Sequence, residues 1–142
     1  MIEEQRVARI VDVNLNRLTE GLRVVEDVLR LAATDRRLLA TVRKLRTEVG
    51  RDSRALRRRV MLARASETDP GRGDWFDRTR RRTLDDVLFA NLKRAEESCR
   101  VLEETLKLLE PDSAPRFKAL RFKLYDIEAA AARALAQDKP SS

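Results

Sequence analysis

Histidine is absent from the 142-residue sequence, and this absence excludes several common reaction centres. A Ser-His-Asp triad, a Cys-His pair and an imidazole acid or base all need that side chain, as does metal binding through histidine. The sequence also lacks the phosphate-binding patterns Gly-x-x-x-x-Gly-Lys-Ser/Thr and Gly-x-Gly-x-x-Gly. An enzyme built from this chain would therefore work by positioning and charge, as phosphoryl transfer can.

Cysteine, glycine, proline and aromatic residues are present but scarce. The one cysteine, Cys99, rules out a disulfide framework and a cysteine-based zinc site and favours a reducing cytoplasm as the compartment. Four glycines, four prolines and 4% aromatic residues, set against 39% charged residues, are typical of long amphipathic helices and not of sheets. We expect an all-α protein of one domain.

Long hydrophobic runs are also missing. The first residues, Met1 to Arg6, contain no apolar signal region, and no stretch approaches the roughly 20 apolar residues that span a bilayer. We therefore expect neither secretion nor a membrane partner.

Basic charge exceeds acidic charge, and most of it is arginine. Six lysines among 31 basic residues leave 25 arginines, and the net charge is +7. The planar arginine fork grips phosphate or carboxylate with two hydrogen bonds, which favours an anionic ligand. Genomic base composition or a solvated helix surface would produce the same excess.

A basic nucleic-acid-binding helical protein, suggested by Arg57–Arg59, is a weaker alternative because no DNA-binding motif is evident and aromatic residues for stacking are few.

Apolar residues at helical spacing predict four helices in two hairpins. They predict a first helix over about residues 3–32 and an antiparallel second helix that starts beyond Asp35 and runs to about residue 64. Thr83 resembles the N-cap of a third helix that ends near Glu110, and a fourth follows. The predicted architecture is a four-helix bundle in one domain, 1–138, made of hairpin 1–65, loop 66–82 and hairpin 83–138, before a disordered tail at 139–142.

The loop between the hairpins is longer than connections in small helical domains usually are. Loops of this length tend to be functional or disordered. Trp75 and Phe76 favour an ordered loop because disordered segments are poor in aromatic residues.

An internal repeat is the most specific pattern in the chain. Residues 14–31 return as residues 91–108, and nine of the eighteen aligned positions are identical. A helix needs only matching apolar positions to fold, so identical polar residues point toward a site. The polar identities, at a constant offset of 77, are Asn14/Asn91, Arg17/Arg94, Glu20/Glu97, Arg23/Arg100 and Glu26/Glu103.

The repeated polar residues have more than one interpretation. The glutamates and arginines have the spacing of ordinary i,i+3 ion pairs, so their recurrence fits such ion pairs as well as it fits a ligand site. Asparagine is costly at the margin of a core unless it is hydrogen-bonded, so Asn14 and Asn91, each beside an arginine one turn later, favour a bound polar partner. Gly21, matched by the small Ser98, indicates close approach of either a ligand or another helix.

The two motifs together resemble the monofunctional hydroxymethylpyrimidine-phosphate kinases of thiamin biosynthesis. The residues that carry the resemblance are Asn14-x-Asn-Arg-x-x-Glu-Gly-Leu-Arg-Val-x-Glu-Asp27 and Ala90-Asn-x-Lys-Arg-x-x-Glu-x-x-Arg-Val-Leu-Glu-Glu104. The resemblance extends from about Arg9 to Glu128. It implies a small helical domain that occurs alone or fused ahead of thiamine-phosphate synthase.

The resemblance implies that ATP phosphorylates 4-amino-2-methyl-5-phosphomethylpyrimidine to the diphosphate, with Mg²⁺ as the cofactor. A phosphate acceptor is mostly ionised near neutral pH, so the missing histidine is no objection. The catalytic residues implied are Lys93, Arg94, Arg64 and Asp69, with Asp69 also the metal ligand, since hard cations prefer carboxylate oxygen. The substrate-binding residues implied are Asn14, Arg17, Gly21, Asn91, Glu97 and Arg100.

The loop departs from the pattern of the kinase family. Arg64, Asp69 and Gly71 persist, but Ala65, Pro70 and Arg72 replace the acid, valine and threonine of the family's pattern. A non-catalytic helical partner or ligand-binding domain of a thiamine-phosphate synthase is therefore an alternative. Because the two repeats differ in detail, we expect one composite cleft in which their Asn/Arg edges meet under residues 64–76. Whether ATP binds to the first or the second repeat, and whether the chain forms a homodimer, stay open.

Overall fold

The computed structural model describes residues 2–32, 35–73 and 80–137, and within these ranges every regular element is a helix. The long helices are α1 (Ile2–Leu31), α2 (Arg36–Asp52), α4 (Leu84–Leu109) and α5 (Ala114–Gln137). Shorter elements are α3 (Arg54–Met61) and the 3₁₀ turns η1 (Ser66–Thr68) and η2 (Pro111–Ser113). The predicted all-α class is confirmed.

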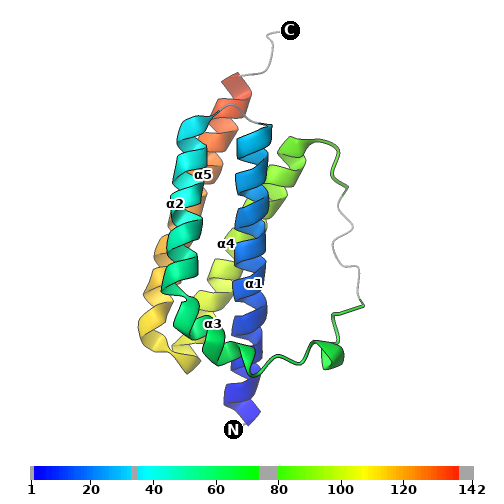
Figure 1. Cartoon of the computed structure of the whole chain (residues 1–142), viewed down its shortest axis with the longest axis vertical. Coiled ribbons are helices and arrows are strands. Elements are labelled where there is room, and N and C mark those ends of the chain that lie inside the picture. The colour runs from blue at the N-terminus through cyan, green and yellow to red at the C-terminus, as the bar shows by residue number, and fades with distance from the viewer. Residues whose placement is uncertain (1, 33–34, 74–79, 138–142) are drawn as a thin grey trace.

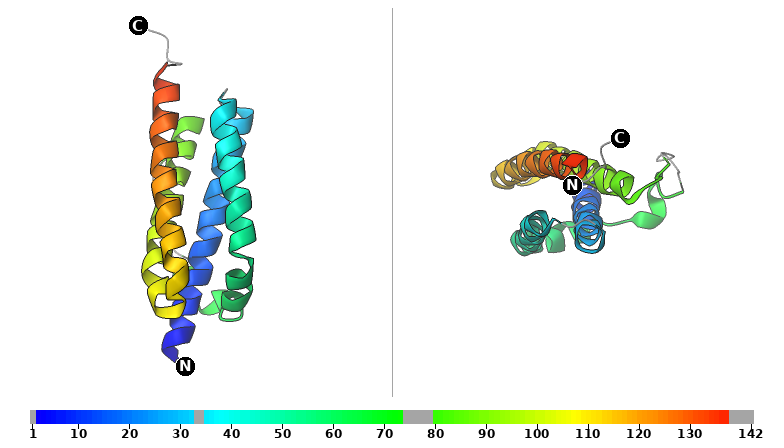
Figure 2. Two further views of the ribbon diagram at one scale, coloured as in Figure 1. Left: turned by 90° about the vertical axis from the view of Figure 1, so that its left-hand side faces the viewer. Right: turned by 90° about the horizontal axis from the view of Figure 1, so that it is seen from above.

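The long helices form a four-helix bundle of two hairpins (Figure 1). Helices α1 and α4 run antiparallel and make the most extensive packing of any pair. Helix α2 packs on α1 and α5 packs on α4, whereas α2 and α5 touch only slightly, as the two views in Figure 2 show. The hairpins are therefore joined mainly through their first helices, which are the helices that carry the repeated motif.

The apolar stripes predicted from the sequence form the core between these helices. Leu15, Leu18 and Leu22 of α1 and Leu92 and Leu102 of α4 have no exposed surface. Burying a leucine contributes on the order of 2 kcal/mol relative to leaving it in water. Repetition of this spacing over several turns of both helices holds α1 against α4 and fixes which of their sides remain outside.

The predicted helix starts are confirmed by their caps. Asp35 accepts hydrogen bonds from the backbone N–H groups of Arg37 and Leu38 at 3.0 Å each, and Thr83 accepts one from Asp86 at 3.1 Å. Each cap satisfies N–H groups that a helix start leaves without an intrahelical partner. The caps therefore begin α2 and α4 where the sequence predicted.

The second helix differs from the prediction because it ends early. It was expected to run to about residue 64, but α2 ends at Asp52 and α3 begins at Arg54. At Ser53 the backbone N–H bonds to the carbonyls of Arg51 and Val49, which closes α2, and Leu56 and Val60 of α3 are then buried against the core. A single straight helix would have to place these two side chains differently, so the break serves the packing of α3 on α1.

Among the described residues, no helix combines the length and the apolarity needed to cross a membrane. The predicted disordered tail at 139–142 and the aromatic pair Trp75 and Phe76 lie outside the described residues.

Candidate functional site

The two copies of the motif meet where α1 crosses α4 at Gly21. A Cβ atom built on Gly21 would lie 3.2 Å from the backbone carbonyl oxygen of Asn91 and 3.8 Å from Cβ of Ala95. The close neighbour of Gly21 is therefore the other helix, which is the packing alternative considered for this glycine. The substrate-binding role assigned to Gly21 is not needed to explain its small size.

The contact at Gly21 sets the register of the two motifs. Gly21 faces the turn of α4 from Asn91 to Ala95. Because the helices are antiparallel, Arg17, one turn before Gly21, lies near the level of residues 95–99, about one turn from Arg94. Both arginines are exposed. We call the surface defined by Asn14, Arg17, Asn91 and Arg94 the α1–α4 face. The two Asn/Arg edges thus lie along one helix interface, and the composite cleft stays a prediction.

The paired asparagines make equivalent hydrogen bonds within their own helices. Nδ2 of Asn14 donates to the carbonyl of Ile10 at 2.9 Å, and Nδ2 of Asn91 donates to the carbonyl of Val87 at 2.8 Å. These bonds explain how Asn14, only 5% exposed, is tolerated beside the core. A carboxamide has a second N–H and an acceptor oxygen, so one such bond does not exhaust its capacity for a ligand.

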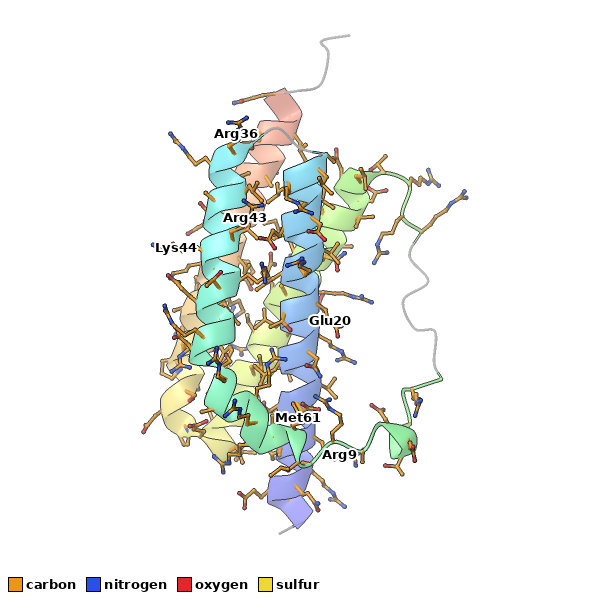
Figure 3. All side chains as sticks on the ribbon, viewed as in Figure 1. Arg9, Glu20, Arg36, Arg43, Lys44 and Met61 are labelled. Carbon is orange, nitrogen blue, oxygen red and sulfur yellow. The ribbon has the colours of Figure 1, made fainter. Side chains whose placement is uncertain are left out.

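The start of the long loop is tied to α1 by two arginines. Nε and Nη2 of Arg64 donate to the two oxygens of Asp12, each at 2.8 Å, and this bonding raises the pKa of Arg64. Arg9 donates to the carbonyl of Ala65 at 3.3 Å, and Figure 3 shows Arg9 beside the end of α3. The described loop residues then lie on the side of α1 away from α2. Arg64, predicted to be catalytic, therefore anchors the loop.

Asp12, the partner of Arg64, was not predicted from the sequence. Its side chain is only 3% exposed, and it pairs with a residue 52 positions away. The available signal was an acid between Val11 and Val13, at the edge of an apolar stripe, where an unpaired carboxylate would be costly.

Asp69, the predicted metal ligand, lies in the described part of the loop. Its Oδ1 accepts a hydrogen bond of 2.8 Å from the backbone N–H of Gly71, which closes a local turn. Within the described ranges, no three Asp, Glu or Cys side chains gather where they could hold a metal ion. Any Mg²⁺ bound by Asp69 would therefore need other oxygen ligands, such as those of phosphate groups.

Lys93 and Arg100 lie on a different side of α4 from Arg94. Nζ of Lys93 donates to Glu96 at 2.9 Å and is 3.5 Å from a carboxylate oxygen of Glu128 on α5. Arg100 pairs with Glu103 at 3.5 Å and with Glu104 at 3.3 Å. Helical spacing places Lys93 and Arg100 toward α5, so they are turned away from the α1–α4 face. The structure thus separates Lys93, predicted to be catalytic, and Arg100, predicted to bind substrate, from Asn14, Arg17, Asn91 and Arg94.

Glu97 is exposed on α4 and lies one turn beyond Arg94. Its repeat counterpart, Glu20, is on the outward side of α1, as Figure 3 shows. Both acids flank the α1–α4 face and do not enter the core.

The remaining repeated pair, Glu26 and Glu103, joins the helices of each hairpin. Arg46 of α2 donates to Glu26 through Nε at 2.7 Å, and Arg121 of α5 donates to Glu103 through Nη2 at 3.0 Å. Of the predicted i,i+3 ion pairs, those between Arg23 and Glu26 at 3.6 Å and between Arg100 and Glu103 at 3.5 Å are present. These two glutamates therefore have a structural explanation, and the correspondence extends to the second helix of each hairpin.

Comparison with known proteins identifies a family and several relatives of this chain. The model of the ThiD2 family matches residues 9–130. A thiamine-phosphate synthase of Gloeobacter violaceus is 40% identical over 132 residues, which cover 92% of this chain and 38% of that protein. A thiamine-phosphate synthase of Thermosynechococcus vestitus is 41% identical over 130 residues, covering 90% of this chain and 36% of that protein.

The chain therefore spans little more than a third of the length of these relatives. No solved structure matches it. The family match includes both copies of the motif, the anchored loop and most of α5, so the match covers the helices that form the bundle and the α1–α4 face. The chain belongs to the ThiD2 family.

Proposed function

We propose that this chain acts in thiamin biosynthesis by binding a phosphorylated aminopyrimidine on the α1–α4 face and transferring a phosphoryl group to it from ATP. One observation carries the proposal: the contact at Gly21 brings the Asn14–Arg17 edge and the Asn91–Arg94 edge to one interface. The resemblance to the pyrimidine-phosphate kinases and the names of the relatives point to the same pathway.

The α1–α4 face has the chemistry that such a ligand requires. Arg17 and Arg94 are exposed, and the arginine fork matches the oxygens of a phosphate group. Asn14 and Asn91 offer both donor and acceptor groups, which suit the edge of an aminopyrimidine. Arginine in this proposal neutralises the phosphates, and asparagine selects the ring.

The proposed reaction needs no general base. An oxygen of the substrate phosphate attacks the γ-phosphorus of ATP, the bond from that phosphorus to the β,γ-bridging oxygen breaks, and ADP leaves. The attacking phosphate is already ionised near neutral pH. Arg17 and Arg94 would hold the two anionic groups near each other and offset their repulsion, which is the main work of catalysis in this reaction class.

We assign Mg²⁺ to the loop side of the face. Mg²⁺ is commonly bound by one or two carboxylates together with substrate phosphates, so Asp69 would be sufficient as a protein ligand. When bound, the ion would reduce the negative charge on the nucleotide. Arg64, through Asp12, would keep the loop that carries Asp69 in place on α1. Lys93 and Arg100 would support the second hairpin through their ion pairs with acids of α4 and α5.

The test is to incubate the pure protein with Mg-ATP and the pyrimidine monophosphate and to follow formation of the diphosphate. Arg94→Ala and Asn91→Ala are expected to reduce turnover by about 10²-fold or more, since each removes a group that orients or neutralises a reactant. Arg58→Ala is the matched control, because Arg58 is an exposed arginine of α3 outside the α1–α4 face. Equal effects of Arg94→Ala and Arg58→Ala would contradict the site.

A second function is favoured by the names and lengths of the relatives. The relatives of Gloeobacter violaceus and Thermosynechococcus vestitus are thiamine-phosphate synthases, and this chain matches 38% and 36% of their lengths. A ligand-binding domain that serves a synthase is therefore the alternative. The loop residues Ala65, Pro70 and Arg72, which depart from the kinase pattern, agree with this alternative. Saturable binding of the pyrimidine monophosphate without turnover, abolished by Arg94→Ala, would select it over the kinase. Absence of both binding and turnover would contradict both functions.

A further inference from the structure

A second arginine-rich surface lies between α1 and α2, and the proposed function does not use it. It is a cleft of about 310 Å³ lined by Arg23, Glu26, Asp27, Arg30, Arg43, Arg46 and Thr47. We call it the arginine cleft. Four arginines against two carboxylates leave it with a net charge of +2. Helical spacing puts its α1 residues on the side of that helix opposite to Arg17, so the arginine cleft and the α1–α4 face are separate.

Only part of this positive charge is needed to neutralise the buried acid. The side chain of Glu26 is 6% exposed, and Arg46 donates to both of its oxygens, at 2.7 and 3.3 Å. Arg121 performs the same task for Glu103 in the second hairpin, and Arg121 is the only α5 arginine needed there. Arg43 therefore adds charge beyond what the burial of Glu26 requires.

Arg43 is also oriented so that it keeps donors for a ligand. It bonds to Glu26 through Nε at 3.2 Å, while half of its side chain is exposed. A guanidinium has five N–H groups, so this one bond leaves the two terminal amino groups as donors. Arg23 and Arg30 on α1 are 58% and 45% exposed and face the same cleft, and both lie within 4 Å of Asp27. The arginine cleft thus presents several charged donors to one small volume.

The repeat supplies an internal comparison for this surface. Aligning Arg46 with Arg121 places Thr47 opposite Phe122 and Gly50 opposite Tyr125. In the second hairpin the rings of Phe122 and Tyr125 have their centroids 5.1 and 5.7 Å from the guanidinium carbon of Arg121. These rings cover the arginine with cation–π contacts, whereas Thr47 and Gly50 leave room above Arg46. The first hairpin has therefore kept open a surface that aromatic side chains cover in the second.

We propose that the arginine cleft is a binding site for a small phosphate-bearing anion with more than one negative charge, such as a diphosphate group. Arginine forks match phosphate oxygens in pairs, and charged hydrogen bonds of this kind are the strong ones. Thr47 is the only uncharged residue of the lining, so the cleft suits a compact polyanion and not an aromatic ring. This site does not rest on the proposed function of the α1–α4 face.

The experiment follows the Nε–H resonances of Arg43 and Arg46 by NMR while inorganic pyrophosphate is added. The wild-type protein is expected to show saturable shifts of both resonances. Arg43→Gln is expected to weaken binding about tenfold, the effect of losing about 1.4 kcal/mol of charged hydrogen bonding. Arg46 continues to pair with Glu26 in this variant, so the fold keeps its buried ion pair.

Two further variants separate a specific site from general charge. Lys118→Gln removes the same charge from the equivalent position of α5 and is expected to change the affinity less than about twofold. Thr47→Phe keeps every charge but fills the cleft as Phe122 does, and it is expected to weaken binding about as much as Arg43→Gln. Equal weakening by Lys118→Gln, no effect of Thr47→Phe, or equal affinity for sulfate would overturn the proposal.

The source of the phosphate groups is identified by repeating the titration with ATP. Shifts at Arg43 and Arg46 that saturate at a lower concentration of ATP than of pyrophosphate would assign the cleft to a nucleotide. The opposite order would assign it to a free diphosphate. No saturable shift with either anion would overturn the site. It would leave the function of Arg17 and Arg94 to its own test, because Arg17 lies on the other side of α1 and Arg94 lies on α4.

Discussion

Replacing glycine by alanine at two positions tests the close approach of α1 and α4. Alanine is the better helix former, so Gly→Ala inside a helix stabilises by roughly 0.5–1 kcal/mol when the new methyl group has room. Gly50 in α2 offers that room, because nothing lies within 4 Å of a Cβ atom built there. Gly21 does not, because its Cβ atom would lie 3.2 Å from the carbonyl oxygen of Asn91, which is a backbone atom and cannot rotate away.

The two substitutions are therefore expected to have opposite signs. Gly50→Ala gains the full stabilisation that alanine brings to a helix relative to glycine. Gly21→Ala gains the same stabilisation but must move two core helices apart, and overpacking of this kind typically costs about 1–3 kcal/mol. We expect Gly21→Ala to be destabilising by up to about 2 kcal/mol and Gly50→Ala to be stabilising by up to about 1 kcal/mol.

Thermal and urea denaturation of both variants measure the difference. In a chain of this size, 1 kcal/mol corresponds to roughly 4 °C in Tm, so the variants should melt about 4–12 °C apart. The same shift of α4 would displace Asn91 and Arg94 from Asn14 and Arg17, so pyrimidine binding should weaken in Gly21→Ala and not in Gly50→Ala. Equal stabilisation by both substitutions would refute the tight contact and, with it, the register on which the α1–α4 face depends.

Three further predictions concern buried titratable groups. Burial alone would raise the pKa of Glu26, but hydrogen bonds and charge from Arg46 lower it below 4.5, so its stabilisation is present above pH 4.5 and lost as the pH falls below it. Glu26→Gln should therefore cost about 2 kcal/mol near neutral pH and less in acid, measured by urea denaturation. Burial, with the charge of Glu128, raises the pKa of Glu96, and Lys93 offsets only part of this. The stability linked to Glu96 is thus present below pH 4.5 and lost as the pH rises through the raised pKa. The free energy of unfolding of Glu96→Gln should therefore increase relative to that of the wild type as the pH rises. A difference between the two proteins that does not change with pH would contradict this. Burial raises the pKa of Cys99 to about 12, so a thiol reagent should label it only after unfolding, and rapid labelling of the native protein would contradict its burial.

Much of the fold could be predicted from the sequence because long helices are recognisable from the spacing of residues close together in the chain. Apolar spacing predicted the core positions of α1 and α4, and the capping residues Asp35 and Thr83 predicted where α2 and α4 begin. The break at Ser53 was missed because no proline interrupts the pattern there and the apolar spacing continues through Leu56. The break is explained by packing of α3 against α1, which is a contact between distant parts of the chain.

The candidate site could be predicted only in part, for a similar reason. The repeat identified Asn14, Arg17, Asn91 and Arg94 as related residues, but it gave Arg100 the same weight, and the family resemblance added Lys93. The structure separates Lys93 and Arg100 because helical spacing places both on another side of α4, where Lys93 pairs with Glu128 of α5.

By itself, the sequence determined the class of fold and the family, and it suggested the residues of the candidate site, because helical periodicity, the repeated motif and the arginine content are all readable along one chain. The tertiary structure decided how those residues are arranged in space. The antiparallel packing at Gly21 placed the two Asn/Arg edges together, Asp12 turned Arg64 into an anchor, and small side chains left the arginine cleft open. Each of these outcomes depends on which atoms of distant segments come within hydrogen-bonding or van der Waals range. The spacing of residues along the chain does not determine the distances between such atoms.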